Sequence, residues 1–245
     1  MKRTIILAFV TLYLVGCASS GVRDDGDLGA APTMRPTQQF LPQPKFDEET
    51  AAYLPYEGKE NPYLVLKGRI NKEAVTAYIE ARRLFNAKDY AAVESKLAEV
   101  VAIDDELSGP WMMRGDIAAI QNDLDKAVAH YQQAIVVRPK NINAYLKLAK
   151  LQRERGEYLR AQNNYADALA VWPDFPEAHL NLGVLYDLYL NQPIAAQRHM
   201  EAYMFLVEEK PAKVAKWLAE IQSRTGIKQA YWQNEQEAAA VPAEN

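Results

Sequence analysis

The side chains in this sequence that could do chemistry are few: one cysteine, Cys17, and three histidines, His130, His179 and His199. No nucleophile motif, Gly-rich phosphate loop or run of metal ligands accompanies them. His179 and His199 could form a catalytic or metal-binding pair, but a metal centre needs further ligands and no third one suggests itself. We therefore expect both rings to pack in a core, with no cofactor, metal or small-molecule substrate. An enzyme or metal-binding protein is the less favoured alternative.

Cys17 follows a short apolar stretch at the start of the chain. Lys2 and Arg3 come first, residues 5–15 are apolar, and Gly16 precedes the cysteine. A charged start, an apolar stretch and a small-residue junction are typical of a secretory signal, and this stretch is too short to span a membrane. The sequence therefore predicts a signal peptide over residues 1–16.

The tetrapeptide Leu14-Val15-Gly16-Cys17 resembles the bacterial lipobox. The resemblance implies cleavage before Cys17, followed by acylation of its sulfur and its new amino group with three chains, palmitate among them. Three chains hold a protein stably on a membrane, whereas one does so only marginally. Ala18, rather than aspartate, implies the inner leaflet of the outer membrane of a Gram-negative bacterium, facing the periplasm. A plain secretory signal is the alternative.

Composition excludes several classes of function. The chain has 245 residues and a formal charge of −4; without Lys2 and Arg3 it keeps 26 cations against 32 anions, which makes −6. This balance gives no basic stripe for nucleic acid. Once Cys17 is acylated no thiol remains, so neither a disulfide nor a thiolate metal site is expected.

Two segments precede the periodic part of the chain. Residues 17–52 carry scattered glycine, proline and charge without apolar periodicity, a composition that predicts a disordered tether behind the lipidated cysteine. Residues 53–73 hold dense apolar groups broken by Pro55, Pro62 and Gly68. We expect this extended segment to pack on the first helix, and a dedicated partner-binding motif is the alternative.

Self-similarity with a period of 34 residues covers 74–209, in blocks 74–107, 108–141, 142–175 and 176–209. The blocks share bulky, small, aromatic and proline positions, clearest at Trp111, Gly115, Tyr131, Ala134 and Pro139. They resemble tetratricopeptide (TPR) repeats, which are helix–turn–helix units. The resemblance implies an all-α TPR solenoid in which small residues let paired helices approach and neighbouring repeats share one core.

The sequence also predicts how the repeat array ends. Val214, Trp217, Leu218 and Ile221 follow the spacing of one amphipathic helix face. We expect a capping helix over residues 210–226, with Gly226 near its end, and a mostly disordered tail over 227–245. Tyr231 and Trp232 either fold back on the cap, which we favour, or bind a partner.

In TPR proteins the first helix of each repeat lines an inner, concave face, so helical phase gives candidate binding residues. The result is an apolar floor with mixed charge, suited to a peptide or helix of a partner protein, unless residues 53–70 or the C-terminal helix fill it. The predicted groove residues are Tyr78, Arg82, Phe85, Met112, Asp116, Leu146, Lys150, Arg153, Leu180, Val184 and Asp187.

One ligand class is excluded by residue type. TPR domains that bind chaperone C-termini use lysine, asparagine and arginine at set places, where this chain has Tyr78, Arg82, Met113, Asn143 and Lys147. Most of that carboxylate clamp is missing.

In anchor and repeat type the chain resembles lipoproteins that support type IV pilus secretin assembly. The resemblance implies a non-catalytic, membrane-anchored scaffold that binds envelope proteins and helps assemble or position a machine such as a pilus or secretion apparatus. An adaptor for cell-wall enzymes, or for an energy-transducing motor complex, is the alternative within the same class.

Overall fold

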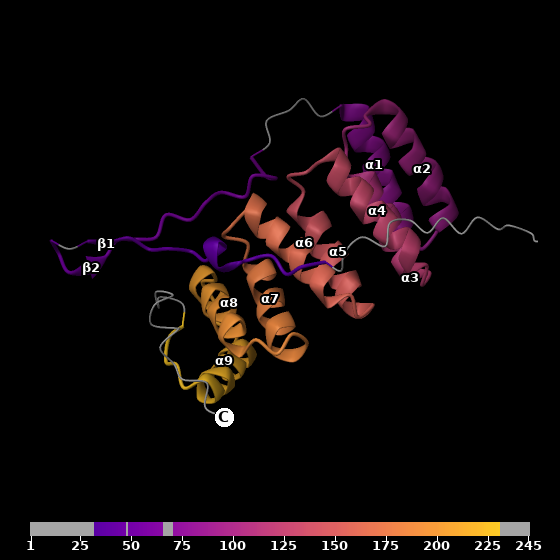
Figure 1. Ribbon diagram of the computed structural model, residues 1–245. Helices are drawn as coiled ribbons and strands as arrows, with labels where there is room; N and C mark the ends of the chain where they lie inside the picture. Colours follow the sequence, from indigo (N-terminus) through magenta and orange to yellow (C-terminus); the bar gives the residue numbers. More distant parts are fainter. Residues whose placement is uncertain (1–31, 48, 66–70, 231–245) are drawn as a thin grey trace, which may run out of the picture. The chain divides into compact units, whose positions relative to one another are not determined.

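The computed structural model describes residues 32–47, 49–65 and 71–230 (Figure 1). The predicted signal peptide, Cys17 and the tail from residue 231 onward lie outside this range. Eight helices of the described part form four antiparallel pairs in chain order, and each pair contacts the next. They are α1 (Lys72–Asn86) with α2 (Tyr90–Ile103), α3 (Gly109–Ile120) with α4 (Leu124–Val137), α5 (Ile142–Glu154) with α6 (Tyr158–Val171), and α7 (Pro176–Leu188) with α8 (Pro193–Leu206).

The turn inside each pair repeats one backbone feature. Lys88, Asn122 and Gly156 have φ values of 62°, 60° and 78°, in the left-handed region. They are spaced by the 34-residue period of the sequence. In the fourth pair the corresponding residue is Asn191, with φ 50°, one position later than the period requires. The turn before α8 is therefore one residue longer, and Pro193 then begins the helix, where proline is tolerated.

Small residues let the paired helices touch, as the repeat pattern predicts. A Cβ atom placed on Gly115 in α3 would lie 2.4 Å from the Tyr131 ring of α4, and one on Gly183 in α7 would lie 2.6 Å from Met200 Cγ of α8. Real Cβ atoms do not approach so closely, so larger residues here would force the helices apart. The neighbouring core positions Ala127 and Ala134 are fully buried.

A ninth helix of the described part, α9 (Ala212–Thr225), packs on α8. Its Ile221 is fully buried in the largest core cluster, which spans α5 to α9. Gly226 ends the helix with φ 70°, the conformation that glycine adopts without a steric penalty.

The first residues of the tail predicted to be mostly disordered, 227–230, are ordered against α8. Ile227 and Ala230 are buried. Gln197 of α8 donates a 2.9 Å hydrogen bond to the Ile227 carbonyl, and the Ala230 amide donates to Glu201 at 3.2 Å. The segment therefore packs on α8, mainly through backbone groups, which leave no apolar period in the sequence.

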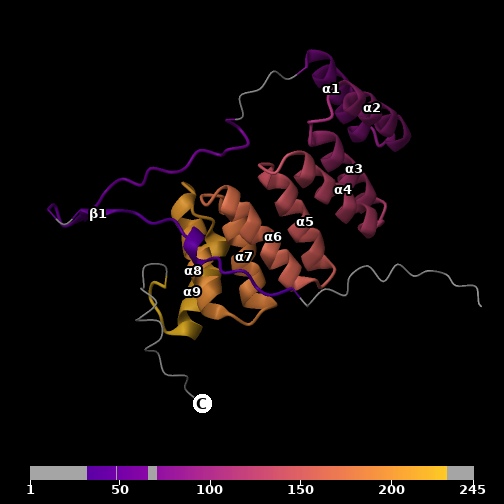
Figure 2. The ribbon, with the colours of Figure 1, turned by 45° about the horizontal axis from the view of Figure 1, so that its top comes forward.

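The predicted tether is also wrong over part of its length. Residues 33–41, the N-terminal strap, contact α6, α7 and α8, and Figure 2 shows the indigo strap crossing these helices. The strap contains the short 3-10 helix η1 (Gln38–Phe40). Thr37 and Leu41 are buried, and Leu41 packs against Ala202 of α8. The strap is held by polar contacts and by Met34, Phe40 and Leu41, which pack on the helices but follow no apolar period in the sequence.

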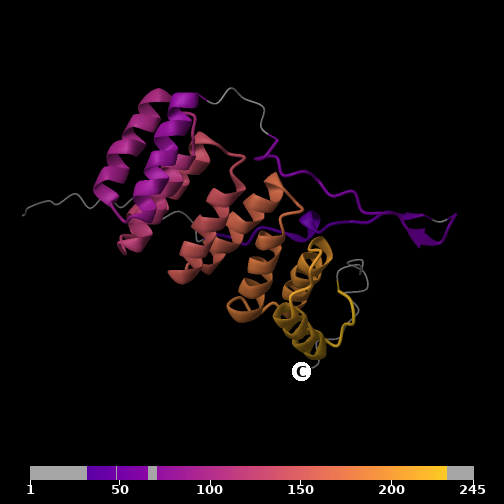
Figure 3. The ribbon, with the colours of Figure 1, turned by 180° about the vertical axis from the view of Figure 1, so that it is seen from behind.

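Beyond the strap, β1 (Phe46–Asp47) and β2 (Ala52–Tyr53) form an antiparallel ribbon in which Phe46 pairs with Tyr53 and Asp47 with Ala52 (Figure 3). Leu54, the residue directly after β2, is 45% exposed.

The segment that follows packs on the helical array, but its residues 56–59 do not pack on the first helix as expected. Tyr56 donates a 2.6 Å hydrogen bond to Asp174, and Trp172 Nε1 donates to the Lys59 carbonyl at 2.6 Å. Tyr56 also meets Phe205 of α8 edge-on. Residues 56–59 therefore lie on the α6–α7 loop and α8 rather than on the first helix, because Asp174 and Trp172 offer the partners that their polar groups need.

Candidate functional site

The first helices of the first three pairs line a cavity of about 510 Å³. Seven predicted groove residues lie in its wall, together with Asn86, Gly109, Met113, Asn141, Asn143, Lys147 and, from the segment before α1, Tyr63. The seven are Tyr78, Arg82 and Phe85 from α1, Met112 and Asp116 from α3, and Leu146 and Lys150 from α5. We call this cavity the α1–α3–α5 groove.

Four predicted residues lie outside this groove: Arg153, Leu180, Val184 and Asp187. Asp187 is the clearest case, with a side chain only 3% exposed. It accepts a 2.7 Å hydrogen bond from Trp217 Nε1 and forms an ion pair with Arg224, both on α9. Val184 packs against the core cluster that α9 completes. Helical phase predicts an inner-face position for Asp187, but the capping helix covers this side chain.

The charges of the groove are partly neutralised from within. Asp116 accepts hydrogen bonds from Tyr131 Oη at 2.8 Å and from Lys147 Nζ at 2.5 Å. Burial, followed by the nearby Asp116 charge, raises the pKa of Tyr131 well above its ordinary value, so the phenol stays protonated and donates. Asp116 and Lys147 therefore cancel as charges. Arg82 and Lys150 are exposed, and no carboxylate of the described residues pairs with either.

Two tyrosines mark the α1 end of the groove. Tyr78 of α1 donates a 3.3 Å hydrogen bond to the Gly109 carbonyl at the start of α3. A Cβ on Gly109 would lie 3.0 Å from the Tyr78 ring, so the absence of a side chain there lets the ring approach α3 closely. Burial, followed by the proximity of Tyr63, raises the pKa of Tyr78. The sequence predicts that residues 53–70 lie near the array. It does not single out Tyr63, because helical periodicity gives no information about a non-helical segment.

A second cavity, of about 580 Å³, adjoins the groove and shares Tyr63, Tyr78, Arg82 and Gly109 with it. Its wall includes Leu64, Val75 and Ile79, which are 78%, 38% and 60% exposed. We call it the α1 pocket.

The two candidate catalytic histidines do come together, but inside the fourth pair. Their Nδ1 atoms lie 2.9 Å apart, His179 Nε2 lies 2.8 Å from the Pro173 carbonyl, and His199 Nε2 lies 2.7 Å from Thr37 Oγ1. All four ring nitrogens thus contact protein atoms. Burial lowers the pKa of His179 to about 4 and that of His199 well below its ordinary value, so both rings are neutral at pH 7.

These contacts fix the tautomers. The Pro173 carbonyl can only accept, so His179 donates from Nε2 and accepts at Nδ1 from His199. Neutral His199 then accepts at Nε2 from the Thr37 hydroxyl, which in turn accepts from Tyr186 at 3.0 Å. The histidine pair therefore anchors the N-terminal strap to α7 and α8.

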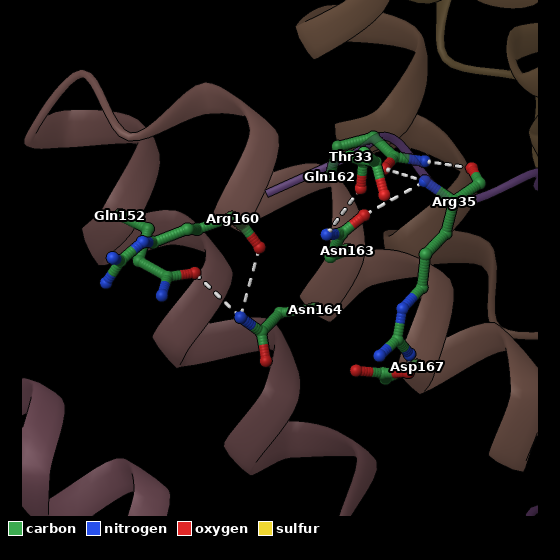
Figure 4. A network of polar contacts seen from close by, with 8 residues as sticks. All are labelled: Thr33, Arg35, Gln152, Arg160, Gln162, Asn163, Asn164 and Asp167. Atoms are coloured by element: carbon green, nitrogen blue, oxygen red, sulfur yellow. Dashed lines mark hydrogen bonds and ion pairs between the residues drawn. The ribbon is translucent and has the colours of Figure 1, made fainter. Parts of the chain in front are cut away.

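A second set of contacts ties the strap to α6 (Figure 4). The Arg35 amide donates to both Gln162 and Asn163 at 3.0 Å, and Gln162 donates back to the Arg35 carbonyl at 2.7 Å. Asn163 also donates to the Thr33 carbonyl, and the Arg35 guanidinium pairs with Asp167. Most of these bonds hold the strap by its backbone.

Two further properties hold for the described residues. No three His, Cys, Asp or Glu side chains in that part of the chain gather closely enough to hold a metal ion. No helix there is long and apolar enough to cross a membrane.

Comparison with known proteins agrees with the helix pairs. Family models described as "TPR repeat" and "Tetratricopeptide repeat" match residues 115–153 and 146–188. The general transcriptional corepressor ssn6 of Schizosaccharomyces pombe is 27% identical over 144 residues, which are 59% of this chain. That stretch spans only 13% of the length of this curated relative.

Solved structures show the same fold at low sequence identity. MamA from Desulfovibrio magneticus is 18% identical, with a TM-score of 0.52 over 64% of this chain and 88% of that one. Pseudomonas aeruginosa PilF is 18% identical, with a TM-score of 0.54 over 63% and 70%. A TPR protein from Parabacteroides merdae is 21% identical, with a TM-score of 0.54 over 64% and 61%. This chain therefore carries tetratricopeptide repeats and has an all-α TPR fold, as its 34-residue period predicts.

Proposed function

We propose that this protein is a non-catalytic scaffold of the bacterial envelope, which binds other envelope proteins through the α1–α3–α5 groove. On this proposal it is held at the inner leaflet of the outer membrane by acylated Cys17 and helps assemble or position a machine such as a pilus or secretion apparatus. The observation that carries the proposal is the groove itself. Its exposed Arg82 and Lys150 and half-buried Phe85, Met112 and Leu146 line a cavity open to a partner.

The support for the anchor comes from the sequence, since Cys17 lies outside the described residues. A Cys17→Ser variant tests it. We expect the wild-type chain to incorporate labelled palmitate and to sediment with outer membranes, and the variant to lose the label and enter the soluble periplasmic fraction. Palmitate incorporation by Cys17→Ser, or an unlabelled wild type, would contradict the anchor.

Photocrosslinking in cells tests the groove. A photoreactive residue at Leu146 probes its floor, and one at Val136 is the matched control, because Val136 is 70% exposed on α4 and lines neither cavity. We expect one specific envelope protein from Leu146 but not from Val136, and its loss in an Arg82→Glu, Lys150→Glu variant. Equal crosslinks from both positions, or crosslinks only within this chain, would refute the groove as the binding site.

The identity of the crosslinked protein also distinguishes a pilus or secretion machine from a cell-wall enzyme or a motor complex. An enzyme that uses His179 and His199 has less support, because every ring nitrogen of the pair already contacts protein atoms in the core.

A further inference from the structure

The wall of the α1–α3–α5 groove carries an excess of positive charge. Its wall carries Arg82, Asp116, Lys147 and Lys150, and the Asp116–Lys147 pair leaves the two other cations unbalanced. Asn86 and Asn143 lie in the same wall with exposed side chains. Such amides can donate to and accept from the backbone of an extended segment. The groove is therefore complementary to a peptide that carries carboxylates.

The α1 pocket has the opposite character. Leu64, Val75 and Ile79 present apolar surface there, and such clustered exposure marks an interaction site more often than isolated apolar residues do. Asp104 and Glu106 also lie in its wall. Arg82 and Arg138 in the same wall balance these two carboxylates, so the pocket carries no excess charge and suits an apolar side chain.

The two cavities are continuous, since they share Tyr63, Tyr78, Arg82 and Gly109. One ligand can therefore occupy both. The axes of packed helices lie about 8–10 Å apart, so a path from α1 across α3 to α5 covers roughly 20 Å. An extended chain advances about 3.3 Å per residue, and about six residues bridge that path.

We infer that the partner bound here presents an extended segment of two parts: aliphatic or aromatic side chains seated in the α1 pocket and, about six residues away, carboxylates facing Lys150 on α5, with Arg82 at the junction of the two cavities. This inference rests on the proposed function and adds to it the chemistry and the orientation of the partner. The partner is a separate protein, because charge complementarity favours an acidic ligand and the described part of this chain places no carboxylate on Arg82 or Lys150.

A phage-displayed library of random dodecapeptides, selected on the purified full chain, tests the inference without knowledge of the partner. We expect enriched peptides to carry aspartate or glutamate at one end and large apolar residues at the other. The dissociation constant of a fluorescein-labelled copy of the best peptide is then measured by anisotropy. Exposed ion pairs are individually weak, so we expect Lys150→Glu to weaken binding roughly fivefold or more and added salt to weaken it further.

Matched controls separate the site from general effects. Lys213→Glu makes the same charge change on exposed α9, outside both cavities, and should leave the dissociation constant unchanged. Ile79→Ser should weaken binding several-fold, whereas Val136→Ser, at an equally exposed apolar residue of α4, should not. A peptide whose acidic residues are changed to glutamine should lose its sensitivity to Lys150→Glu.

The outcomes are distinguishable. Enriched peptides without acidic residues, or affinities insensitive to Lys150→Glu and Ile79→Ser, would overturn this inference while a peptide-binding function survives. A failure to enrich any peptide would overturn both. Enrichment of sequences that match residues 231–237 of this chain, which contain Trp232, Glu235 and Glu237, would overturn the choice of a separate partner and identify the chain itself as the occupant.

Discussion

The Nδ1 atoms of His179 and His199 lie 2.9 Å apart in the core of the fourth repeat, each ring being held from its other side by a protein oxygen. The two rings can share this contact only when one Nδ1 donates and the other accepts, which requires the accepting ring, His179, to be neutral. A proton added to His179 would set two N–H groups against each other.

Stability should therefore fall in mild acid. His179 has its ordinary pKa of 6.5 in the unfolded chain and a pKa of about 4 in the folded one, so the unfolded chain takes up the proton first as the pH falls. The free energy of unfolding is unaffected above pH 6.5 and decreases between pH 6.5 and 4, by about 3 kcal/mol for this residue. The nearby Asp174 charge opposes the lowering of the His179 pKa, and the Arg198 charge adds to the lowering of the His199 pKa.

Urea denaturation at a series of pH values measures this effect. We expect the free energy of unfolding to fall less steeply between pH 6.5 and 5 in His179→Gln than in the wild type. His130→Gln should keep the wild-type slope, since His130 is only half-buried. Equal slopes in the wild type and His179→Gln would show that the histidine pair does not govern the acid response.

The strap should stabilise the last two repeats through Thr37. Thr37→Val keeps the shape of the side chain but removes the partner of His199 Nε2 and the acceptor of the Tyr186 hydroxyl, which still accepts from Gln162. A buried polar group without a partner costs about 1–3 kcal/mol, so the urea midpoint should fall accordingly. Gln39→Ala, at an exposed strap residue, should change stability by less than about 0.5 kcal/mol. Equal effects of the two substitutions would contradict the docked strap.

Substitutions in the repeated left-handed turn should change stability in opposite directions at Lys88 and Gly156. Lys88 has φ 62°, whereas Gly156 holds the same place in the third repeat with φ 78°. A residue with a Cβ pays roughly 1 kcal/mol in this conformation, so Lys88→Gly should raise the melting temperature and Gly156→Ala should lower it. Lys88→Ala, which keeps the Cβ, is the control and should change little. Stabilisation by Lys88→Ala as large as that by Lys88→Gly would assign the effect to the lysine side chain instead.

Asp187 should matter for stability and not for binding. Asp187→Asn removes the charge that the buried carboxylate presents to Trp217 and Arg224, and we expect a loss of about 1–3 kcal/mol. Asp125→Asn breaks the pair with Arg155, but Asp125 is 89% exposed, so less than about 1 kcal/mol is expected there. Peptide affinity of the groove should be the same in both variants, and weaker binding in Asp187→Asn would return this residue to the binding site.

The repeats could be predicted from the sequence because packing imposes a period on them. Gly115 and Gly183 recur where paired helices touch, since any side chain there collides with Tyr131 or Met200. The same period gives the helix faces, and thus the groove residues from Tyr78 to Lys150. Asp187 shows the limit: helical phase gives the direction of a side chain, but not which later helix covers it.

The strap could not be predicted for a different reason. Its bonds to Gln162 and Asn163 run from its backbone, which every residue possesses. Thr37 is one hydroxyl in a stretch rich in proline and charge, and its partner, His199, lies far away along the sequence. Such contacts depend on tertiary placement and leave neither a period nor a hydrophobic signal.

The docked strap also determines where tension would enter the molecule. Any pull on the chain ahead of residue 33 reaches the strap before it reaches α1, and the strap is bonded to α6, α7 and α8. Several of these bonds and the buried Leu41 would have to yield before force acted on the first repeat. The largest core cluster of the described residues would thus bear the force first. The α1–α3–α5 groove would keep its shape while the protein is pulled.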